Sequence, residues 1–371
     1  MTAANRASEE RRGGTVVVTG GGTGGHLYPA IAVAQALRRK RPVIGILFIG
    51  REAEKDRAEV EKKGIDFVGL KLEGLQRRIS LTNLRSLAYA AGGLWRCLRM
   101  MKRYPKGVVF GVGGYVSAPA MVAGKILGWR VTMHEQNTIP GLVNRIMAPW
   151  CASVFITYEE TKKWLKDTAC EWTGFPLRRE LIERRRQASV AAKECPGILV
   201  IGGSQGARKL VETGLEALKR LDEANLPYRA VVQAGERNYE WAQTLGAPQR
   251  AELVPFIHDM PEAYAAADIV VSRAGSGSLA EIALWGRPSI LVPYPFASEN
   301  HQQKNAEVFA QRGAARLIPE NELTTEALSE ALAGLLRDEE KRKTMSARAL
   351  ELARDDAADR IAEEILRWLE A

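Results

Sequence analysis

Cysteine is scarce in this sequence, and the motifs in which cysteine usually binds metal are missing. The four cysteines lie far apart and form no C-x-x-C pair: Cys97, Cys151, Cys170 and Cys195. Histidine is equally scarce, and none of the four histidines is paired with another at i and i+4. Isolated cysteines argue against a zinc site or a disulfide framework and are typical of a reducing compartment.

Long hydrophobic runs are also missing. The most apolar stretch, Val116–Trp129, is interrupted by Pro119 and Lys125, and a membrane-spanning helix needs about 18 uninterrupted apolar residues. Residues 1–14 are polar and charged and lack the apolar segment of a signal peptide, so we expect a disordered N-terminus. These absences predict a soluble or peripheral protein on the cytoplasmic side.

The composition has none of the extremes that mark fibrous or disordered chains. Of 371 residues, 46% are hydrophobic and 26% are charged, which excludes collagen-like, coiled-coil and disordered classes. At about 150 residues per domain, this length predicts two domains, each large enough to bury its own core.

Positive charge is concentrated in one segment. The chain has 53 basic and 44 acidic residues, a net charge of +9. Residues 75–106 contain no acidic side chain but eight basic ones, namely Arg77, Arg78, Arg85, Arg96, Arg99, Lys102, Arg103 and Lys106. A local basic field of this kind indicates an anionic partner, either a membrane surface or a polyphosphate.

Short apolar runs alternate with helical-period stretches along both halves of the chain. Each half opens with a strand, a glycine-rich loop and a helix: Thr15–Thr19 precedes a helix near Tyr28–Arg39, and Gly197–Ile201 precedes a helix over Ala207–Leu221. Further strands are predicted at Val43–Ile49, Val108–Val112, Arg130–His134, Arg229–Gln233, Ala251–Val254, Ile269–Ser272 and Ser289–Pro293. This alternation is typical of parallel βαβ units.

The repeat predicts an α/β fold with two Rossmann-like domains that face a cleft. We expect the domains at residues 15–175 and 176–352, joined through the Gly- and Pro-containing stretch Trp172–Leu177. Residues 353–371 are expected to form an amphipathic helix that packs back on the N-terminal domain. Ligands bind such sheets at the carboxyl ends of the strands.

The first glycine loop, Gly20–Gly25, is followed at once by His26. Its glycines allow backbone N–H groups to approach an anion, and the next helix adds the partial positive charge of its N-terminus. An NAD site would also need an acidic residue at the end of the second strand, where the chain reads Ile49-Gly50-Arg51. NAD is therefore disfavoured, although Arg51 leaves NADP open.

Two more loops of this type lie in the second half. Gly202–Gly206 adds the hydroxyl of Ser204, and Arg273–Glu281 opens a helix that carries a carboxylate. Glu281 is expected either to accept hydrogen bonds from ribose hydroxyls or merely to complement the helix dipole. The chain contains neither a D-x-D motif nor G-x-x-x-x-G-K-[ST]. We therefore expect no metal and no cofactor, with helix N-termini neutralising a diphosphate.

Five motifs in this order resemble the MurG family, the N-acetylglucosaminyltransferases of peptidoglycan lipid-intermediate synthesis. They are Gly21-Gly22-Thr23-Gly24-Gly25-His26, Gly113-Gly114-Tyr115-Val116-Ser117, His134-Glu135-Gln136-Asn137, Gly202-Gly203-Ser204-Gln205-Gly206-Ala207 and His301-Gln302-Gln303. The resemblance implies the GT-B glycosyltransferase architecture and an inverting, metal-independent transfer. The implied substrates are UDP-GlcNAc and the undecaprenyl-linked MurNAc-pentapeptide, joined by a β-1,4 link.

The resemblance also implies roles for individual residues. On the donor side, Glu281 would hold the ribose, Ser204 the diphosphate, the backbone of Ile257 the uracil, Gln302 and Gln303 the sugar, with Arg178 and Ser276, Gly277, Ser278, Leu279 and Ala280 also at the donor. Thr23, Gly24, Gly25 and Asn137 would line the cleft from the other side. His26 is the first candidate for the general base, followed by Tyr115 and Glu135. The sequence departs from the family in the extra glycine of the third loop and in Gly174-Phe175-Pro176, where Gly-Asn-Pro is usual.

Residues 75–106 are expected to dock on the anionic inner leaflet, because the acceptor's lipid stays in the bilayer. The segment interleaves apolar side chains, among them Ile79, Leu84 and Trp95, with Arg77, Arg78 and Arg85. The alternative is that Leu87, Leu94 and Leu98 face the core and the arginines are only solvated. No nucleic-acid partner is expected.

Two other functions stay open at this point. One is a different nucleotide-sugar enzyme, such as a UDP-GlcNAc epimerase or a glycolipid transferase. The other is a non-enzymatic nucleotide-binding or NADP-dependent redox protein.

Overall fold

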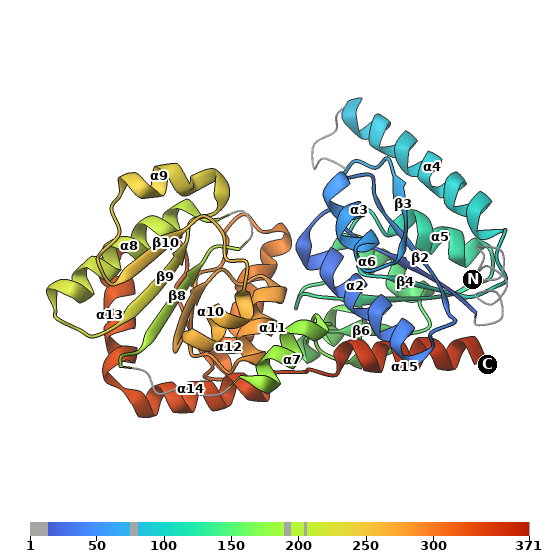
Figure 1. The fold of residues 1–371 in the computed structure, drawn as a ribbon. Helices are drawn as coiled ribbons and strands as arrows, with labels where there is room; N and C mark the ends of the chain where they lie inside the picture. Colours follow the sequence, from blue (N-terminus) through green and yellow to red (C-terminus); the bar gives the residue numbers. More distant parts are fainter. Residues whose placement is uncertain (1–13, 75–80, 189–193, 204–205, 371) are drawn as a thin grey trace. The chain divides into compact units, whose positions relative to one another are not determined.

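The computed structural model describes residues 14–74, 81–188, 194–203 and 206–370 (Figure 1). The chain forms two compact units. The N-terminal unit comprises the chain up to Arg178 together with Asp355 onward, and the C-terminal unit comprises Arg179–Arg354. The chain therefore passes from one unit to the other twice. Arg77, Arg78, Ile79 and Ser204, all named above, lie outside the described residues.

The N-terminal unit is built on a seven-stranded parallel sheet with the order β3-β2-β1-β4-β5-β6-β7. The strands are β1 Thr15–Thr19, β2 Gly45–Arg51, β3 Asp66–Leu70, β4 Val108–Gly111, β5 Arg130–Glu135, β6 Val154–Ile156 and β7 Cys170–Trp172. β1, at the centre, is buried at all five positions, as its run of β-branched residues requires for a strand covered on both faces.

Helices cover both faces of this sheet. They are α2 Gly24–Lys40, α3 Glu54–Glu61, α4 Leu81–Met101, α5 Ala118–Ile126, α6 Leu142–Met147 and α15 Ala357–Glu370, with 3-10 turns η1 Ala148–Trp150 and η2 Glu159–Trp164. α15 packs against α2, as Figure 1 shows, and buries Ile361 and Ile365 in the same core cluster as Val16 and Phe110.

The C-terminal unit repeats this plan with six parallel strands in the order β10-β9-β8-β11-β12-β13. The strands are β8 Gly197–Ile201, β9 Arg229–Gln233, β10 Ala251–Val254, β11 Ile269–Ser272, β12 Ser289–Leu291 and β13 Ala315–Leu317. The helices and turns are α7 Arg179–Gln187, α8 Arg208–Glu223, η3 Glu236–Asn238, α9 Tyr239–Thr244, α10 Met260–Ala266, α11 Ser276–Leu284, η4 Ser298–Asn300, α12 His301–Gln311, α13 Thr325–Arg337 and α14 Glu339–Glu351.

Both sheets reverse their winding direction at the first strand of the unit. β1 lies between β2 and β4, and β8 lies between β9 and β11. In open α/β sheets, ligands bind beyond the carboxyl ends of the strands at such a switch point. The loops that follow β1, β4, β8 and β11 are therefore the places to look for a site.

The stretch expected as a linker is packed more tightly than a linker usually is. Cys170–Trp172 forms β7, and residues 173–177 are all buried within the N-terminal unit. His134 contributes to this packing, because its ring lies edge-on to Phe175 and bonds the carbonyl of Gly174. The first passage between the units therefore comes only after Arg178.

Candidate active site

The glycine loop after β1 adopts a backbone that only glycine takes easily. Gly21 and Gly22 have φ values of +122° and +81°, and a Cβ at Gly20 would lie 2.1 Å from a methyl group of Val112. α2 then begins at Gly24, and no side chain caps it. Thr23, Gly24 and Gly25 are exposed. The loop thus presents the uncapped N-terminus of a 17-residue helix, which favours an anion.

His26 lies on the first turn of α2 and is half-buried. Its Nδ1 is 3.0 Å from Oγ1 of Thr23, and its ring packs over Gly114, where a Cβ would meet ring atoms at 3.7 Å. Gly114 belongs to the loop after β4 and has a φ of +74°. The glycine loop and the Gly113–Ser117 loop therefore meet at this imidazole. Tyr115, next to Gly114, is 36% exposed.

His134 and Glu135 end β5, and both are almost fully buried. Nε2 of His134 donates to the Gly174 carbonyl at 2.9 Å, and Nδ1 lies 3.1 Å from the amide nitrogen of Gln136. Because a carbonyl can only accept, the neutral ring carries its proton on Nε2. Burial lowers the pKa of His134 to about 4, against the Gly174 hydrogen bond, which raises it.

Glu135 anchors the loop that follows β5. Its carboxylate accepts hydrogen bonds from the backbone N–H groups of Asn137 at 2.8 Å and Gly141 at 3.1 Å, and from the side chain of Asn144 at 2.6 Å. Burial raises the pKa of Glu135 to about 6, although these hydrogen bonds oppose the shift. At 1% exposure the carboxylate faces protein donors, so its geometry favours holding the loop over taking a substrate proton.

Asn137 and Arg178, the other residues expected to bind substrate that belong to the N-terminal unit, lie in different places. Asn137 is half-buried in the loop that Glu135 anchors, and its carbonyl accepts from the hydroxyl of Thr161 at 3.1 Å. The guanidinium of Arg178 lies 4.8 Å from the ring centroid of Tyr28, which is on α2. Arg178, expected at the donor, thus stacks on the helix that follows the first glycine loop.

In the C-terminal unit, the loop after β11 leads into α11, again without a side-chain cap. The side chain of Leu279 is completely buried, and the hydroxyl of Ser276 lies 3.3 Å from the side-chain nitrogen of Asn305. Gly277, Ser278, Ala280 and Glu281 are half-buried on the rest of the helix. The side chain of Leu279 therefore belongs to the core and does not face a ligand.

Gln302 and Gln303 lie on the first turn of α12. The side-chain oxygen of Gln302 accepts from the backbone N–H of Tyr294 at 3.0 Å, which leaves the amide N–H₂ as its donor group. Ile257 is half-buried in the loop after β10. The structure thus places Ile257, the residues 276–281 and the two glutamines on the loops and helices that follow β10, β11 and β12.

Arg273, directly after β11, is a residue whose role the sequence did not reveal. It is buried, forms an ion pair with Glu320 and donates to the carbonyls of Val292 and Pro293 at 3.2 Å each. It thereby holds the loop that leads to the two glutamines. An arginine between a buried strand and a Gly/Ser turn was the available signal.

A cavity of about 1780 Å³ in the C-terminal unit lies at the amino ends of the strands, opposite the loops described above. It is lined by the amino ends of β8, β9 and β10 and by Arg185, Trp285 and Arg287. None of the residues expected to bind the donor lines it, so we assign no donor contact there.

Over the described ranges, no group of three or more His, Cys, Asp or Glu side chains is placed to hold a metal ion. Within the same part of the chain, no helix is both long and apolar enough to span a membrane.

Comparisons with known proteins place this geometry in a family. Residues 16–156 match the N-terminal domain of glycosyltransferase family 28, and residues 197–361 match its C-terminal domain. The chain belongs to glycosyltransferase family 28. Both matched regions contain a glycine loop described above, and the two parallel sheets are those of the GT-B architecture.

Two similar proteins carry the same enzyme name. A Desulforamulus reducens protein is 38% identical over 349 residues, which is 91% of this chain and 94% of that protein. It is a UDP-N-acetylglucosamine–N-acetylmuramyl-(pentapeptide) pyrophosphoryl-undecaprenol N-acetylglucosamine transferase. A Bacillus cereus protein of the same name is 34% identical, over 92% of this chain and 96% of its own length. The crystal structure of Acinetobacter baumannii MurG has a TM-score of 0.78 and 26% identity, covering 95% and 99% of the two chains.

Proposed function

We propose that this family 28 enzyme transfers GlcNAc from UDP-GlcNAc to the C4 hydroxyl of MurNAc in undecaprenyl-diphospho-MurNAc-pentapeptide. The observation that carries this proposal is the identity of 33–38% with transferases named for these substrates, along more than nine-tenths of the chain. The motifs that are expected to carry the chemistry lie in both matched domains, so we expect both domains to take part in the reaction.

The donor is assigned to the C-terminal unit. Glu281 holds the ribose hydroxyls, the backbone of Ile257 faces the uracil, and Gln302 and Gln303 bind the sugar. Three helices that follow glycine-containing loops, α2, α8 and α11, begin without a side-chain cap. The uncapped N-termini of α8 and α11 can neutralise a diphosphate without a cation, with the hydroxyl groups of Ser204 and Ser276 expected as further donors.

The acceptor is assigned to the N-terminal unit, with its diphosphate at the N-terminus of α2. The sugar hydroxyl O4 attacks C1 of GlcNAc from the face opposite UDP, and the bond from C1 to the diphosphate breaks, which inverts the anomeric centre. The proton of O4 passes to His26, because this imidazole is half-buried at the loop and is oriented by Thr23. Tyr115 is the next candidate by exposure, and Glu135 holds the adjoining loop.

The membrane partner is assigned to α4. Leu84, Leu87 and Trp95 are 64%, 55% and 62% exposed, and residues 84 and 95 are three helical turns apart, on one face. Arg99 lies 5.4 Å from the ring of Trp95 and adds positive charge beside it. An apolar stripe bordered by cations suits an anionic bilayer surface. We therefore place the enzyme at the membrane surface, on its cytoplasmic face.

Transfer of radiolabelled GlcNAc to a lipid-linked MurNAc-pentapeptide tests the proposal. We expect labelled lipid product that requires the acceptor and forms equally well with EDTA, because helix N-termini supply the positive charge. Release of UDP without acceptor would indicate a different nucleotide-sugar reaction. A rate that collapses on chelation and returns with Mg²⁺ would contradict the metal-free account.

A further inference from the structure

Asp56 lies on α3, outside every motif discussed above, and contacts the first glycine loop. Its Oδ2 accepts a hydrogen bond from the backbone N–H of Gly22 at 2.9 Å, across 34 residues of sequence. The side chain is 9% exposed. The other acidic residues of this helix, Glu54, Glu59 and Glu61, are exposed or half-buried. Asp56 is thus the carboxylate of α3 that is turned toward the first glycine loop.

The same oxygen also lies against the neighbouring residue of the loop. A Cβ at Gly21 would lie 2.9 Å from Oδ2 of Asp56. The carboxylate therefore packs on the two residues that take left-handed φ values, +122° and +81°. Glycine takes such a backbone without strain but is also free to leave it, so a charge-assisted hydrogen bond to its backbone N–H is a strong restraint on the loop.

The hydrogen bond to Asp56 also means that the backbone N–H groups of the loop have different partners. The N–H of Gly22 points at a protein carboxylate, so it is not offered to a ligand. The exposed turn Thr23–Gly25 and the uncapped start of α2 follow immediately. A shift of Gly22 would move Thr23, and with it His26, because the Thr23 hydroxyl lies 3.0 Å from Nδ1 of His26.

We propose that Asp56 is a positioning residue, whose carboxylate fixes Gly22 so that the turn Thr23–Gly25 and His26 keep the geometry that the acceptor diphosphate and its reacting hydroxyl require. The inference rests on the proposed function only for the identity of the acceptor. The hydrogen bond is a property of the fold and can be tested without any substrate.

Hydrogen exchange tests whether Asp56 holds the loop. In Asp56→Ala, a peptide that contains residues 20–23 should exchange at least tenfold faster than in the wild type. The matched control is Glu54→Ala, which removes an exposed carboxylate from the same helix and should leave that peptide unchanged. Equal protection of the loop in Asp56→Ala and the wild type would overturn the proposal.

Kinetic measurements test whether the restraint that Asp56 places on Gly22 affects the transfer of GlcNAc. Asp56→Ala should lower kcat/KM for the lipid acceptor by about 10- to 100-fold, while KM for UDP-GlcNAc changes less than twofold. Asp56→Asn keeps an acceptor oxygen for Gly22 and should restore most of the loss. Wild-type acceptor kinetics in Asp56→Ala would overturn the proposal. An equal rise in both KM values, together with a lowered melting temperature, would also overturn it, because it would show a general loss of stability. If Asp56→Ala does not fold, the comparison of Asp56→Asn with Asp56→Leu decides by the same criteria.

The two proposals fail in different ways. A wild-type enzyme that transfers nothing to the lipid acceptor contradicts the proposed function, whatever the exchange of residues 20–23. A wild-type enzyme that transfers normally, together with unchanged exchange in Asp56→Ala, contradicts the role of Asp56 alone.

Discussion

Three titratable side chains of the N-terminal unit differ in how deeply they are buried, and the depth decides which of them can exchange a proton with a substrate near neutral pH. His26 is half-buried at an exposed turn, whereas His134 and Glu135 lie within the unit and are occupied by hydrogen bonds to protein. The same residue types thus take different roles because of the depth at which β5 and α2 place them.

His26→Ala should lower kcat by about 10²- to 10⁴-fold with little change in KM for UDP-GlcNAc, because a positioned general base contributes about that much. The acidic limb of the pH–rate profile should disappear with the imidazole. Thr23→Val, which removes only the hydroxyl beside Nδ1, should lose far less. A nearly unchanged kcat in His26→Ala would move the base to Tyr115.

Glu281→Gln should weaken binding of the UDP sugar about 10- to 100-fold, since hydrogen bonds to a charged acceptor contribute about 1.5–3 kcal/mol. Calorimetric titration with UDP measures this directly. The control is Glu330→Gln, an exposed carboxylate on α13. If UDP binds Glu281→Gln as tightly as the wild type, this carboxylate serves only the helix dipole.

His134 should make the stability of the N-terminal unit sensitive to acid. Its pKa in the folded protein, about 4, lies below the ordinary value of 6.5, so its contribution to stability is present above pH 6.5 and is lost as the pH falls through 4. At about 1.4 kcal/mol per pKa unit, the full loss is about 3.5 kcal/mol. Glu135, whose folded pKa is raised, acts in the opposite direction between pH 4.5 and 6.

His134→Gln isolates this effect, because the amide can still donate to Gly174 while it cannot take up the proton. Urea unfolding at pH 7 and pH 4.5 should show that the wild type loses about 2–3 kcal/mol more than the variant. Glu135 is present in both proteins and largely cancels in the comparison. Parallel pH dependences would show that His134 does not titrate between its folded and unfolded states as its burial requires.

The sequence indicated the glycine-rich motifs because their residues are contiguous, and local composition is enough to reveal a turn that needs glycine. It could not indicate the contacts of Asp56 or Arg273, because their partners lie far away in the chain. Asp56 reaches Gly22 across 34 residues, and Arg273 reaches Glu320 across 47. Such contacts depend on which strands become neighbours, and periodicity within one segment carries no information on that.

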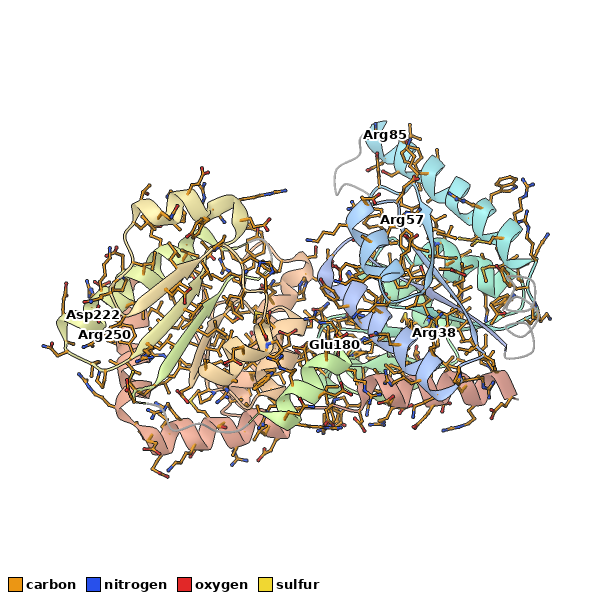
Figure 2. The ribbon with its side chains drawn as sticks, in the orientation of Figure 1. Arg38, Arg57, Arg85, Glu180, Asp222 and Arg250 are labelled. Carbon is orange, nitrogen blue, oxygen red and sulfur yellow. The ribbon has the colours of Figure 1, made fainter. Side chains whose placement is uncertain are left out.

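At the scale of the element, α4 shows how one helix divides an apolar sequence between two environments. Leu94 and Leu98 are partly buried against the core, while Leu84, Leu87 and Trp95 remain exposed. The alternative considered from sequence therefore describes Leu94 and Leu98, but not Leu87. Arg85, labelled in Figure 2, forms an ion pair with Glu73 at 2.8 Å, so its charge is partly compensated by a residue just before the basic segment.

Leu84→Ser with Trp95→Ser should release the enzyme from vesicles that contain anionic lipid, because it removes the two ends of the exposed stripe. Sedimentation with vesicles at physiological salt measures the loss, which should be at least tenfold in the partition coefficient. Leu350→Ser, which removes a 43% exposed side chain from α14 of the C-terminal unit, is the control. Turnover of a water-soluble acceptor should be spared, and unchanged vesicle binding would move the docking surface away from α4.

At the scale of the whole molecule, the repeated strand, glycine loop and helix predicted both sheets and their parallel strands. Four strands were not predicted: β3 and β7, the two edge strands of the first sheet, β6, which lies next to β7, and β13, an edge strand of the second sheet. β6, β7 and β13 have only three residues each, too few to show a period. Short edge strands pair because a neighbour presents its backbone, which is again a consequence of the assembled sheet.

Because the last segment of the chain returns to the N-terminal unit, the two units differ in which segments they need in order to fold. The C-terminal unit is one continuous segment, whereas the N-terminal unit needs α15 to complete its core. Ile361 and Ile365 are fully buried there. Arg39 and Lys40 on α2, and Arg41 directly after it, form ion pairs with Asp359, Glu363 and Glu370 on α15. Each isoleucine contributes about 1.5–3 kcal/mol by burial, and exposed ion pairs contribute less than about 1 kcal/mol each.

A chain ending at Arg354 should therefore lose much of the stability of its N-terminal unit, since a domain has only about 5–15 kcal/mol in total. Calorimetry should show one transition shifted strongly downward and a second, assigned by UDP binding, unchanged. Ile361→Ala with Ile365→Ala in the full chain should reproduce most of the shift, and Asp359→Asn with Glu363→Gln should reproduce little of it. If the chain ending at Arg354 melts like the full chain, the core of the N-terminal unit closes without α15, and the apolar face of that helix serves another purpose.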